Sequence, residues 1–306
     1  MQLPLGLRPL SLLGLSVMVA LLNISCGGGG YSSSSTSTPP GTASASSQFG
    51  HVVLVVEENH NYSDVVGNSL MPYLNGLIAK YGLATQYYAN THPSIGNYFM
   101  LTTGQTITTN DGFTGTATDD NIVRELIAAG KTWKSYAEGL PSVGYTAGDA
   151  YPYVKRHNIL EFFSDVVNST TQVNNLVPFS QFSSDLSSGS LPNFSFVVPD
   201  LLDDAHDGPL PVADAWLAHN IDPLISSPVF QKDGLLIIVF DEADGTDTTH
   251  GGGHVAAVIV SPKAKPGYQS TTLYQHQSTL RLILGGLGVT VFPGASAQAP
   301  DMSEFF

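Results

Sequence analysis

The spacing of apolar and polar positions changes several times along the chain after residue 50. Four short runs are almost entirely apolar, as expected for strands buried on both faces of a sheet. These runs are residues 51–56 (HVVLVV), 194–200 (FSFVVPD), 234–241 (GLLIIVFD) and 254–262 (HVAAVIVSP). The pattern predicts a strand at each of them.

Other segments repeat apolar residues at the three- and four-residue spacing that predicts helices. The segment 119–130 is the clearest, because Asp and Asn residues precede it and Gly130 ends it. Ser69 is a candidate cap for a helix that ends near Gly82. Two further helices are predicted, at 212–226 and 274–288.

Strands that alternate with helices predict an α/β fold, here a single domain with a largely parallel central sheet flanked by helices. In such sheets ligands bind beyond the carboxyl ends of the strands. Polar clusters follow the predicted strands after Val56, Val198 and Phe240. We therefore expect a functional site at this edge of the sheet.

The first 48 residues do not share this pattern. Residues 1–26 combine Arg8 with an apolar run and end at Cys26, the only cysteine of the chain. They resemble a bacterial lipoprotein signal with Cys26 as the lipidation site, and a plain secretory signal is the alternative. Residues 27–48 are rich in Gly, Ser and Thr, which predicts a flexible, disordered linker. We expect an exported protein, either a periplasmic or cell-surface lipoprotein or a secreted one, whose folded domain is residues 49–306.

Charge limits the classes of partner. Lys and Arg number 11 against 25 Asp and Glu, so the net charge is −14. Binding to the phosphate backbone of nucleic acids requires a basic surface, and this composition argues against it. A small phosphorylated substrate stays compatible, because a bound cation inverts the local field.

Two polar clusters lie in the first third of the chain. Glu57, Glu58 and Asn59 follow the first strand and offer the oxygen ligands that hard divalent cations prefer, although a solvated turn or helix cap has the same composition. Ser94 follows a proline and precedes a helical run. A helix N-terminus there would favour a phosphate and an ionised hydroxyl, and a simple cap is the alternative.

Two further clusters combine carboxylates with histidines. They comprise Asp200, Asp203, Asp204, His206 and Asp207 in the third cluster, and Asp241, Glu242, Asp244, His250 and His254 in the fourth. Such mixtures suit Zn, Mn or Fe, and the loop spacing permits two ions. Calcium-type turns are the competing interpretation, but histidine is a poor calcium ligand.

Taken in order, the four clusters resemble the phosphoesterase family that contains bacterial acid phosphatases and phospholipases C, within the alkaline phosphatase superfamily. The motifs that carry the resemblance are VVLVVEENHNY, THPSIGNYFMLTTG, VPDLLDDAHDG and VFDEADG followed by HVAAVIVSP. The resemblance extends from His51 to about Val289 and implies an alkaline phosphatase-like fold.

The resemblance also implies residue roles. The Glu–Asn pair after the first strand corresponds to Glu58 and Asn59 as metal ligands. Ser94 corresponds to the nucleophile and a ligand of the same metal, and Asn97 to the residue that touches the phosphate. The acidic pair Asp241 and Glu242 completes this metal site. Glu57 departs from the family, which more often has an apolar residue there.

A second metal is implied less directly. Two-metal relatives use an Asp-x-x-x-His pair with a later histidine, for which Asp200 or Asp203, His206 and His254 are the candidates. The spacing in PDLLDDAHDGP departs from the superfamily pattern, so the second ion and its aspartate stay open. His206 is also the candidate acid for the leaving group. The resemblance implies one or two divalent ions, with Zn, Mn, Fe, Mg and Ca as candidates.

The predicted function is a metal-dependent phosphoric ester hydrolase, acid phosphatase-like, that acts through a serine nucleophile on a small phosphorylated substrate. A phospholipase C-type phosphodiesterase is the alternative, and an inactive surface binding module is a third. A phosphomonoester is favoured because the chain shows no basic amphipathic helix, so that membrane contact would come only through a lipid anchor. Residues 105–189 are expected to cap the site, with Lys155, Arg156 and His157 as a basic patch for a substrate phosphate or carboxylate.

Overall fold

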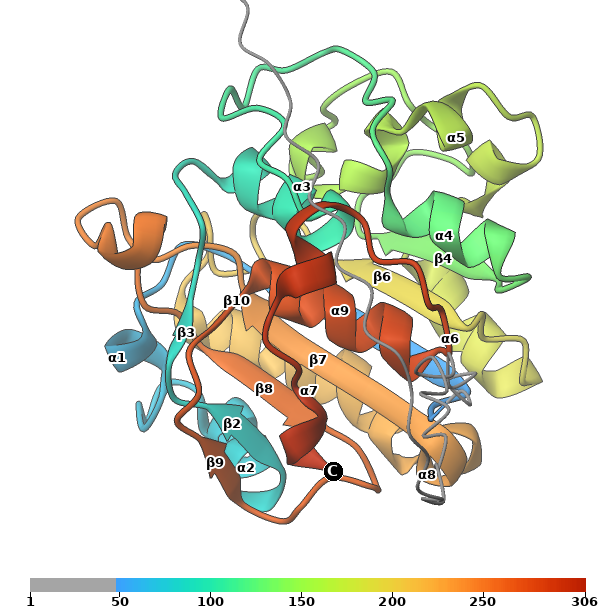
Figure 1. The fold of residues 1–306 in the computed structure, drawn as a ribbon. Coiled ribbons are helices and arrows are strands. Elements are labelled where there is room, and N and C mark those ends of the chain that lie inside the picture. Colours follow the sequence, from blue (N-terminus) through green and yellow to red (C-terminus); the bar gives the residue numbers. More distant parts are fainter. Residues whose placement is uncertain (1–47) are drawn as a thin grey trace, which may run out of the picture. The chain divides into compact units, whose positions relative to one another are not determined.

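The computed structural model describes residues 48–306, and its centre is an eight-stranded sheet (Figure 1). The strand order is β5-β4-β6-β1-β7-β8-β2-β9. The strands are β1 (His51–Glu57), β2 (Gly82–Ala84), β4 (Trp133–Ala137), β5 (Leu176–Pro178), β6 (Phe194–Val198), β7 (Gly234–Phe240), β8 (Ala257–Val260) and β9 (Tyr268–Ser270). A separate two-stranded sheet pairs β3 (Tyr87–Tyr88) with β10 (Tyr274–Gln275).

The central sheet is largely parallel, as predicted. β1 lies between β6 and β7 and runs parallel to both, with Val52 opposite Phe194 and Leu235. β8 alone among the eight strands runs antiparallel to its neighbours β7 and β2. The loop before β8 therefore lies at the same edge of the sheet as the carboxyl ends of β1, β6 and β7.

Helices cover both faces of the sheet (Figure 1). α3 packs against α9 on the near face in that view, and α7 and α8 lie behind the sheet. The helices are α1 (Tyr62–Val65), α2 (Pro72–Lys80), α3 (Ser94–Thr103), α4 (Ile122–Ala128), α5 (Ser164–Val167), α6 (Ser180–Ser188), α7 (Leu210–Ser226), α8 (Pro228–Asp233) and α9 (His276–Gly286). Six short 3-10 turns are η1 (Lys155–His157), η2 (Ile159–Phe162), η3 (Gln172–Asn175), η4 (Thr249–Gly251), η5 (Gly294–Gln298) and η6 (Ser303–Phe305).

The helix limits follow local chemistry. α4 begins after Asn121, whose side chain accepts a hydrogen bond from the backbone N–H of Arg124, so the predicted cap is confirmed. α2 begins instead at Pro72, with Met71 and not Ser69 before it. Gly82, expected to end that helix, is the first residue of β2.

The segment 105–189, expected to cap the site, is in part a component of the sheet. It contains β4 and β5, and β4 pairs in parallel with β6. The same segment contains η1, which carries His157 into the interior, where the side chain is 1% exposed. The segment therefore contributes both to the core and to the site.

The predictions for residues 1–26, the linker and lipidation at Cys26 fall outside the described residues, apart from the last linker residue, Gln48. Within residues 48–306 no helix is both long and apolar enough to cross a membrane.

Candidate active site

The carboxyl ends of β1 and β7 and the first turn of α3 meet around one hydroxyl group. Ser94 is the first residue of α3 and is 3% exposed. Its Oγ donates to Glu58 Oε2 at 3.0 Å and lies 3.2 Å from Glu242 Oε1. The structure thus brings these three residues, which are distant in the sequence, together beyond the strand ends.

Two oxygen atoms beside this hydroxyl are buried without a hydrogen-bond partner. They are Asn59 Oδ1 and Asp241 Oδ2. Asp241 Oδ1 accepts from the backbone N–H groups of Asn59, at 3.2 Å, and Glu242, at 2.6 Å. Asn59 has a φ of 51°, a left-handed conformation that is uncommon outside glycine. Buried polar atoms almost always have a hydrogen-bond partner. Two buried oxygens without one indicate a position for a ligand that accepts electron pairs.

The electrostatics of the cluster also favour a cation. Burial raises the pKa of Glu58 well above its usual value, and the nearby charge of Asp241 raises it further. Burial likewise raises the pKa of Asp241, with Glu242 as the main like charge. The pKa of Glu242 is raised to about 7, chiefly by burial. A divalent ion would offset this repulsion, and the all-oxygen donor set fits a hard or borderline cation.

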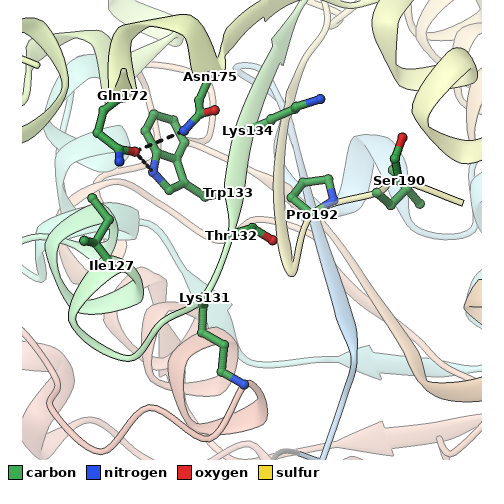
Figure 2. Close-up of a pocket in the computed structure, with 10 residues that line it drawn as sticks. Ile127, Lys131, Thr132, Trp133, Lys134, Gln172, Asn175, Ser190 and Pro192 are labelled. Carbon is green, nitrogen blue, oxygen red and sulfur yellow. Dashed lines mark hydrogen bonds between the residues drawn. The ribbon is translucent and has the colours of Figure 1, made fainter. Parts of the chain in front are cut away.

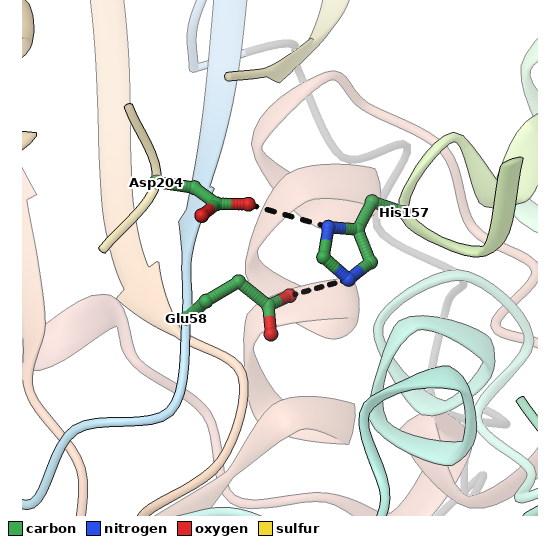
Figure 3. Close-up of side chains that lie close together, drawn as sticks. All are labelled: Glu58, His157 and Asp204. Atoms are coloured by element: carbon green, nitrogen blue, oxygen red, sulfur yellow. Dashed lines mark ion pairs between the residues drawn. The ribbon is translucent and has the colours of Figure 1, made fainter. Parts of the chain in front are cut away.

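A histidine that we did not assign to the metal site lies against Glu58 (Figure 3). Its Nε2 is 3.3 Å from Glu58 Oε1, and its Nδ1 is 3.3 Å from Asp204 Oδ2. The histidine is His157, and its ring stacks on Tyr98 with the ring centroids 5.0 Å apart. Tyr98 in turn donates to Glu58 Oε1 at 2.6 Å.

The environment of His157 is unusual for a buried ring. Burial lowers the pKa of His157 well below its usual value, so the ring is neutral near pH 7. Neither ring nitrogen has a hydrogen-bond partner, and neither does Asp204 Oδ2. Glu58, His157 and Asp204 bring three ligand atoms within 4.8 Å of one another. This mixed nitrogen and oxygen set fits a divalent ion such as zinc.

Two more histidines lie at the edge of the cluster. The ring of His206 is 6.0 Å from that of His157, and its Nδ1 lies 2.7 Å from Asp207 Oδ1. His92 places Nδ1 at 2.7 Å from Glu242 Oε2, opposite the oxygen that faces Ser94. His206 thus lies beside His157, whereas His92, which we did not single out, contacts Glu242 directly.

Other predicted residues lie in different surroundings. The Asn97 side chain holds the turn before α3, because its Oδ1 accepts from the backbone N–H groups of Asn90 and Thr91 at 2.9 and 3.2 Å. Asp200 and Asp203 group with Glu138.

His254 belongs to neither acidic group. Its ring stacks between Tyr62 and Tyr88 at 4.2 and 4.8 Å, and its Nε2 lies 3.0 Å from the carbonyl of Thr85. The structure does not bring His254 together with Asp200 and Asp203 as the sequence-based ligand set proposed.

A separate hollow of about 380 Å³ lies at the opposite edge of the sheet, where β4 begins and β6 is about to begin (Figure 2). Gln172 Oε1 accepts there from Trp133 Nε1 at 2.9 Å and from Asn175 Nδ2 at 3.1 Å. No carboxylate or histidine lines this hollow. It therefore lacks the carboxylate and imidazole ligands that a metal site of the predicted kind requires.

Comparisons with known proteins identify the family to which the chain is similar. A model of the Phosphoesterase family matches residues 68–289. A phosphatidylinositol-3-phosphatase of Mycobacterium tuberculosis is 34% identical over 268 residues, which cover 86% of this chain and 85% of that protein. An acid phosphatase of Aspergillus fumigatus is 30% identical over 245 residues, covering 76% of this chain and 53% of the fungal protein. The chain thus spans about half the length of that fungal relative.

Solved structures of low sequence identity share the architecture. A protein of the alkaline phosphatase superfamily from Vibrio parahaemolyticus aligns with a TM-score of 0.57 at 16% identity, covering 80% of this chain and 67% of that one. The lipoteichoic acid synthase LtaP from Listeria monocytogenes aligns with a TM-score of 0.56 at 14% identity, covering 80% and 74%. These likenesses concern the fold alone, and they confirm the expected alkaline phosphatase-like architecture.

Proposed function

Because the chain belongs to the phosphoesterase family and is a hydrolase of phosphoric esters, we propose that it removes phosphate from phosphomonoesters with Ser94 as the nucleophile. One observation carries the proposal. The hydroxyl of Ser94 lies at a helix N-terminus between Glu58 and Glu242, beside the unpaired oxygens of Asn59 and Asp241. A hydroxyl amid three buried carboxyl groups has surroundings suited to a cation and to a reactive alkoxide.

We assign the first metal site to Glu58, Asn59, Ser94, Asp241 and Glu242. The trio of Glu58, His157 and Asp204 is the candidate for a second ion. It replaces the set that the resemblance implied, which was Asp200 or Asp203 with His206 and His254. When bound, the ion supplies positive charge that stabilises a serine alkoxide and the charge on the phosphoryl oxygens.

Each side chain of the site then has a separate role in the reaction. Ser94 Oγ gives its proton to Glu242 Oε1, which lies 3.2 Å away. The oxygen forms a bond to phosphorus, and the bond from phosphorus to the alcohol breaks. His206, held by Asp207, gives a proton to the departing oxygen. Water then cleaves the phosphoserine, releasing phosphate and restoring the hydroxyl.

The relatives support the substrate class. The fungal relative carries the name acid phosphatase, and the mycobacterial one the name phosphatidylinositol-3-phosphatase. Both names describe removal of phosphate from a monoester, although the second substrate is a lipid. This agrees with a phosphomonoester and leaves open how large the alcohol is.

A substrate comparison tests the proposal. The metal-loaded protein should hydrolyse an aryl phosphomonoester with a kcat/KM well above that for the matching diester or for phosphatidylcholine. Trapping of radiolabelled phosphate on Ser94 by acid quench should accompany turnover. A preference for the diester would refute the monoester assignment, and labelling of another residue would refute the role of Ser94.

We also propose export through residues 1–26. The residue types around Cys26 support it, and incorporation of labelled palmitate that disappears in Cys26→Ser is the test.

A further inference from the structure

A cavity of about 400 Å³ lies between the segments 111–114 and 146–149 and the turn η1. Its wall includes Asp111, Phe113, Asp149, Lys155 and Arg156. Asp111 links the cavity to the start of α3, because its Oδ1 accepts at 3.3 Å from the backbone N–H of Ile95, the residue after Ser94. A cavity of this size is large for one phosphoryl group and suits the alcohol part of a substrate.

The two basic side chains of the wall differ in how well they are partnered. Lys155 Nζ donates to the carbonyl of Thr146 at 2.9 Å and lies 3.9 Å from Glu161 Oε1. The guanidinium of Arg156 makes no hydrogen bond within residues 48–306, and its Nε is buried without a partner. Its nearest carboxylate is Asp111 Oδ2, 4.0 Å from Nε, which is too far for a hydrogen bond. Arg156 is therefore the side chain with free donors.

The other arginines in the described part of the chain already have hydrogen-bond partners. Arg124 forms hydrogen bonds with both carboxylate oxygens of Asp165, and Arg281 donates to the carbonyls of Ser296 and Ala297. A partly buried guanidinium with unpaired donors costs free energy unless an anion meets it.

The position of Arg156 relates it to the reaction site. Its sequence neighbour His157 contacts Glu58 at 3.3 Å. The contact with His206 is the main cause that lowers the pKa of Asp207, and the positive charge of Arg156 lowers it further. Arg156 thus directly precedes a residue that contacts Glu58, and it lines the cavity.

We propose that Arg156 binds an anionic group on the alcohol part of the substrate, so that the enzyme prefers phosphomonoesters whose alcohol carries a carboxylate or a second phosphate. This inference rests on the proposed phosphomonoesterase function and adds a substrate class to it. Arg156 acts here as a specificity-determining residue, and Asp111 competes with the substrate anion for it.

The test uses two matched pairs of substrates that differ by one carboxylate. They are glycerol phosphate with phosphoglycerate, and phenyl phosphate with carboxyphenyl phosphate. In each pair we compare kcat/KM for the ester whose alcohol part carries the carboxylate with kcat/KM for the ester whose alcohol part is uncharged. The measured quantity is the ratio of the first to the second. In Arg156→Gln this ratio should fall about 10- to 100-fold, the usual effect of losing a charge-assisted hydrogen bond.

Two further variants make the test sharper. Asp111→Asn keeps an oxygen to accept from Ile95 but removes the competing charge, so the ratio should rise. Arg124→Gln removes an arginine that is already paired, and the ratio should stay at the wild-type value. Asp111→Asn also keeps the test decisive if Arg156→Gln does not fold.

The outcomes separate this inference from the proposed function. An equal loss on both members in Arg156→Gln would mean that Arg156 holds the transferred phosphoryl group, which overturns the inference. An unchanged ratio in both Arg156→Gln and Asp111→Asn would overturn it as well. Failure of metal-loaded wild-type protein to hydrolyse any of the four esters would instead refute the phosphomonoesterase function.

Discussion

The Nδ1 atom of His92 lies 2.7 Å from Glu242 Oε2, while the other oxygen of that carboxylate faces Ser94. The second ring nitrogen of His92 lies 2.9 Å from the backbone carbonyl of Asp247. Both nitrogens thus face acceptors, and both donate only when the ring is protonated. Through these two contacts His92 would hold Glu242 in position beside the hydroxyl.

Loss of this contact should reduce turnover. We expect His92→Ala to lower kcat/KM about 10- to 100-fold, because partners that orient a metal ligand or a base have effects of that size. The exposed His219 offers a matched control, and His219→Ala should retain wild-type kcat/KM. Equal rates in the two variants would remove His92 from the mechanism.

Substitution of the proposed nucleophile should abolish turnover. Ser94→Ala should lower kcat on an aryl phosphate by more than about a thousandfold, since no other group forms the phosphoryl ester. Metal content and melting temperature should stay near those of wild type. Ser183→Ala, which changes an exposed serine of α6, serves as the control. Near-normal kcat in Ser94→Ala would mean that water attacks directly.

Metal content distinguishes the two candidate ion sites. We expect chelation to abolish activity, and addition of a divalent ion to restore it. Two equivalents should be measured in wild type by elemental analysis, and one in either Asp241→Asn or His157→Phe. Phenylalanine keeps the stack on Tyr98 and removes only the nitrogens. One equivalent in wild type, unchanged in His157→Phe, would leave His157 as a partner that orients Glu58.

Stability should depend on pH through a group outside the metal ligands. Burial raises the pKa of Glu161 from 4.5 to about 8, against an opposing effect of Lys155. The folded state therefore holds this proton more tightly than the unfolded state. The contribution of Glu161 to the free energy of unfolding is complete below about pH 4.5, and it is lost as the pH rises towards about 8.

The measurement is the free energy of unfolding of wild type and Glu161→Gln, at constant metal content, across this pH range. The difference between wild type and variant should fall by about 2–4 kcal/mol as the pH rises, since one pKa unit corresponds to about 1.36 kcal/mol. Asp119→Asn, at an exposed position, controls for the substitution itself. A difference that does not change with pH would contradict the raised pKa.

The strands that the sequence predicted correctly are those with strong local patterns. β1, β6 and β7 are buried on both faces, so their apolar runs are unmistakable. Because parallel strands end at one edge, Glu58 and Asp241 could be placed together from sequence alone. β2 and β9 have three residues each and β10 has two. Strands this short show no recognisable alternation of apolar and polar residues.

The contribution of His157 could not be predicted in the same way. It comes from a 3-10 turn in the long segment 105–189, whose path depends on tertiary packing and not on local periodicity. Its neighbours Lys155 and Arg156 also made the segment resemble a basic surface patch. A turn in which Ala205 has a φ of 74° decides which aspartate of the third cluster faces the site. This turn directs Asp204 towards His157.

Because β8 runs antiparallel to β7, the loop that joins these two strands can be altered without changing the sheet. β7 and β8 pair directly, so residues 243–253 connect two neighbouring strands without a helix that crosses the sheet. Loops anchored in this way tolerate changes of length far better than crossover connections do. A protein engineer could therefore vary the length of this loop on an unaltered sheet, provided that Asp241, Glu242 and the Asp247 carbonyl that contacts His92 are retained.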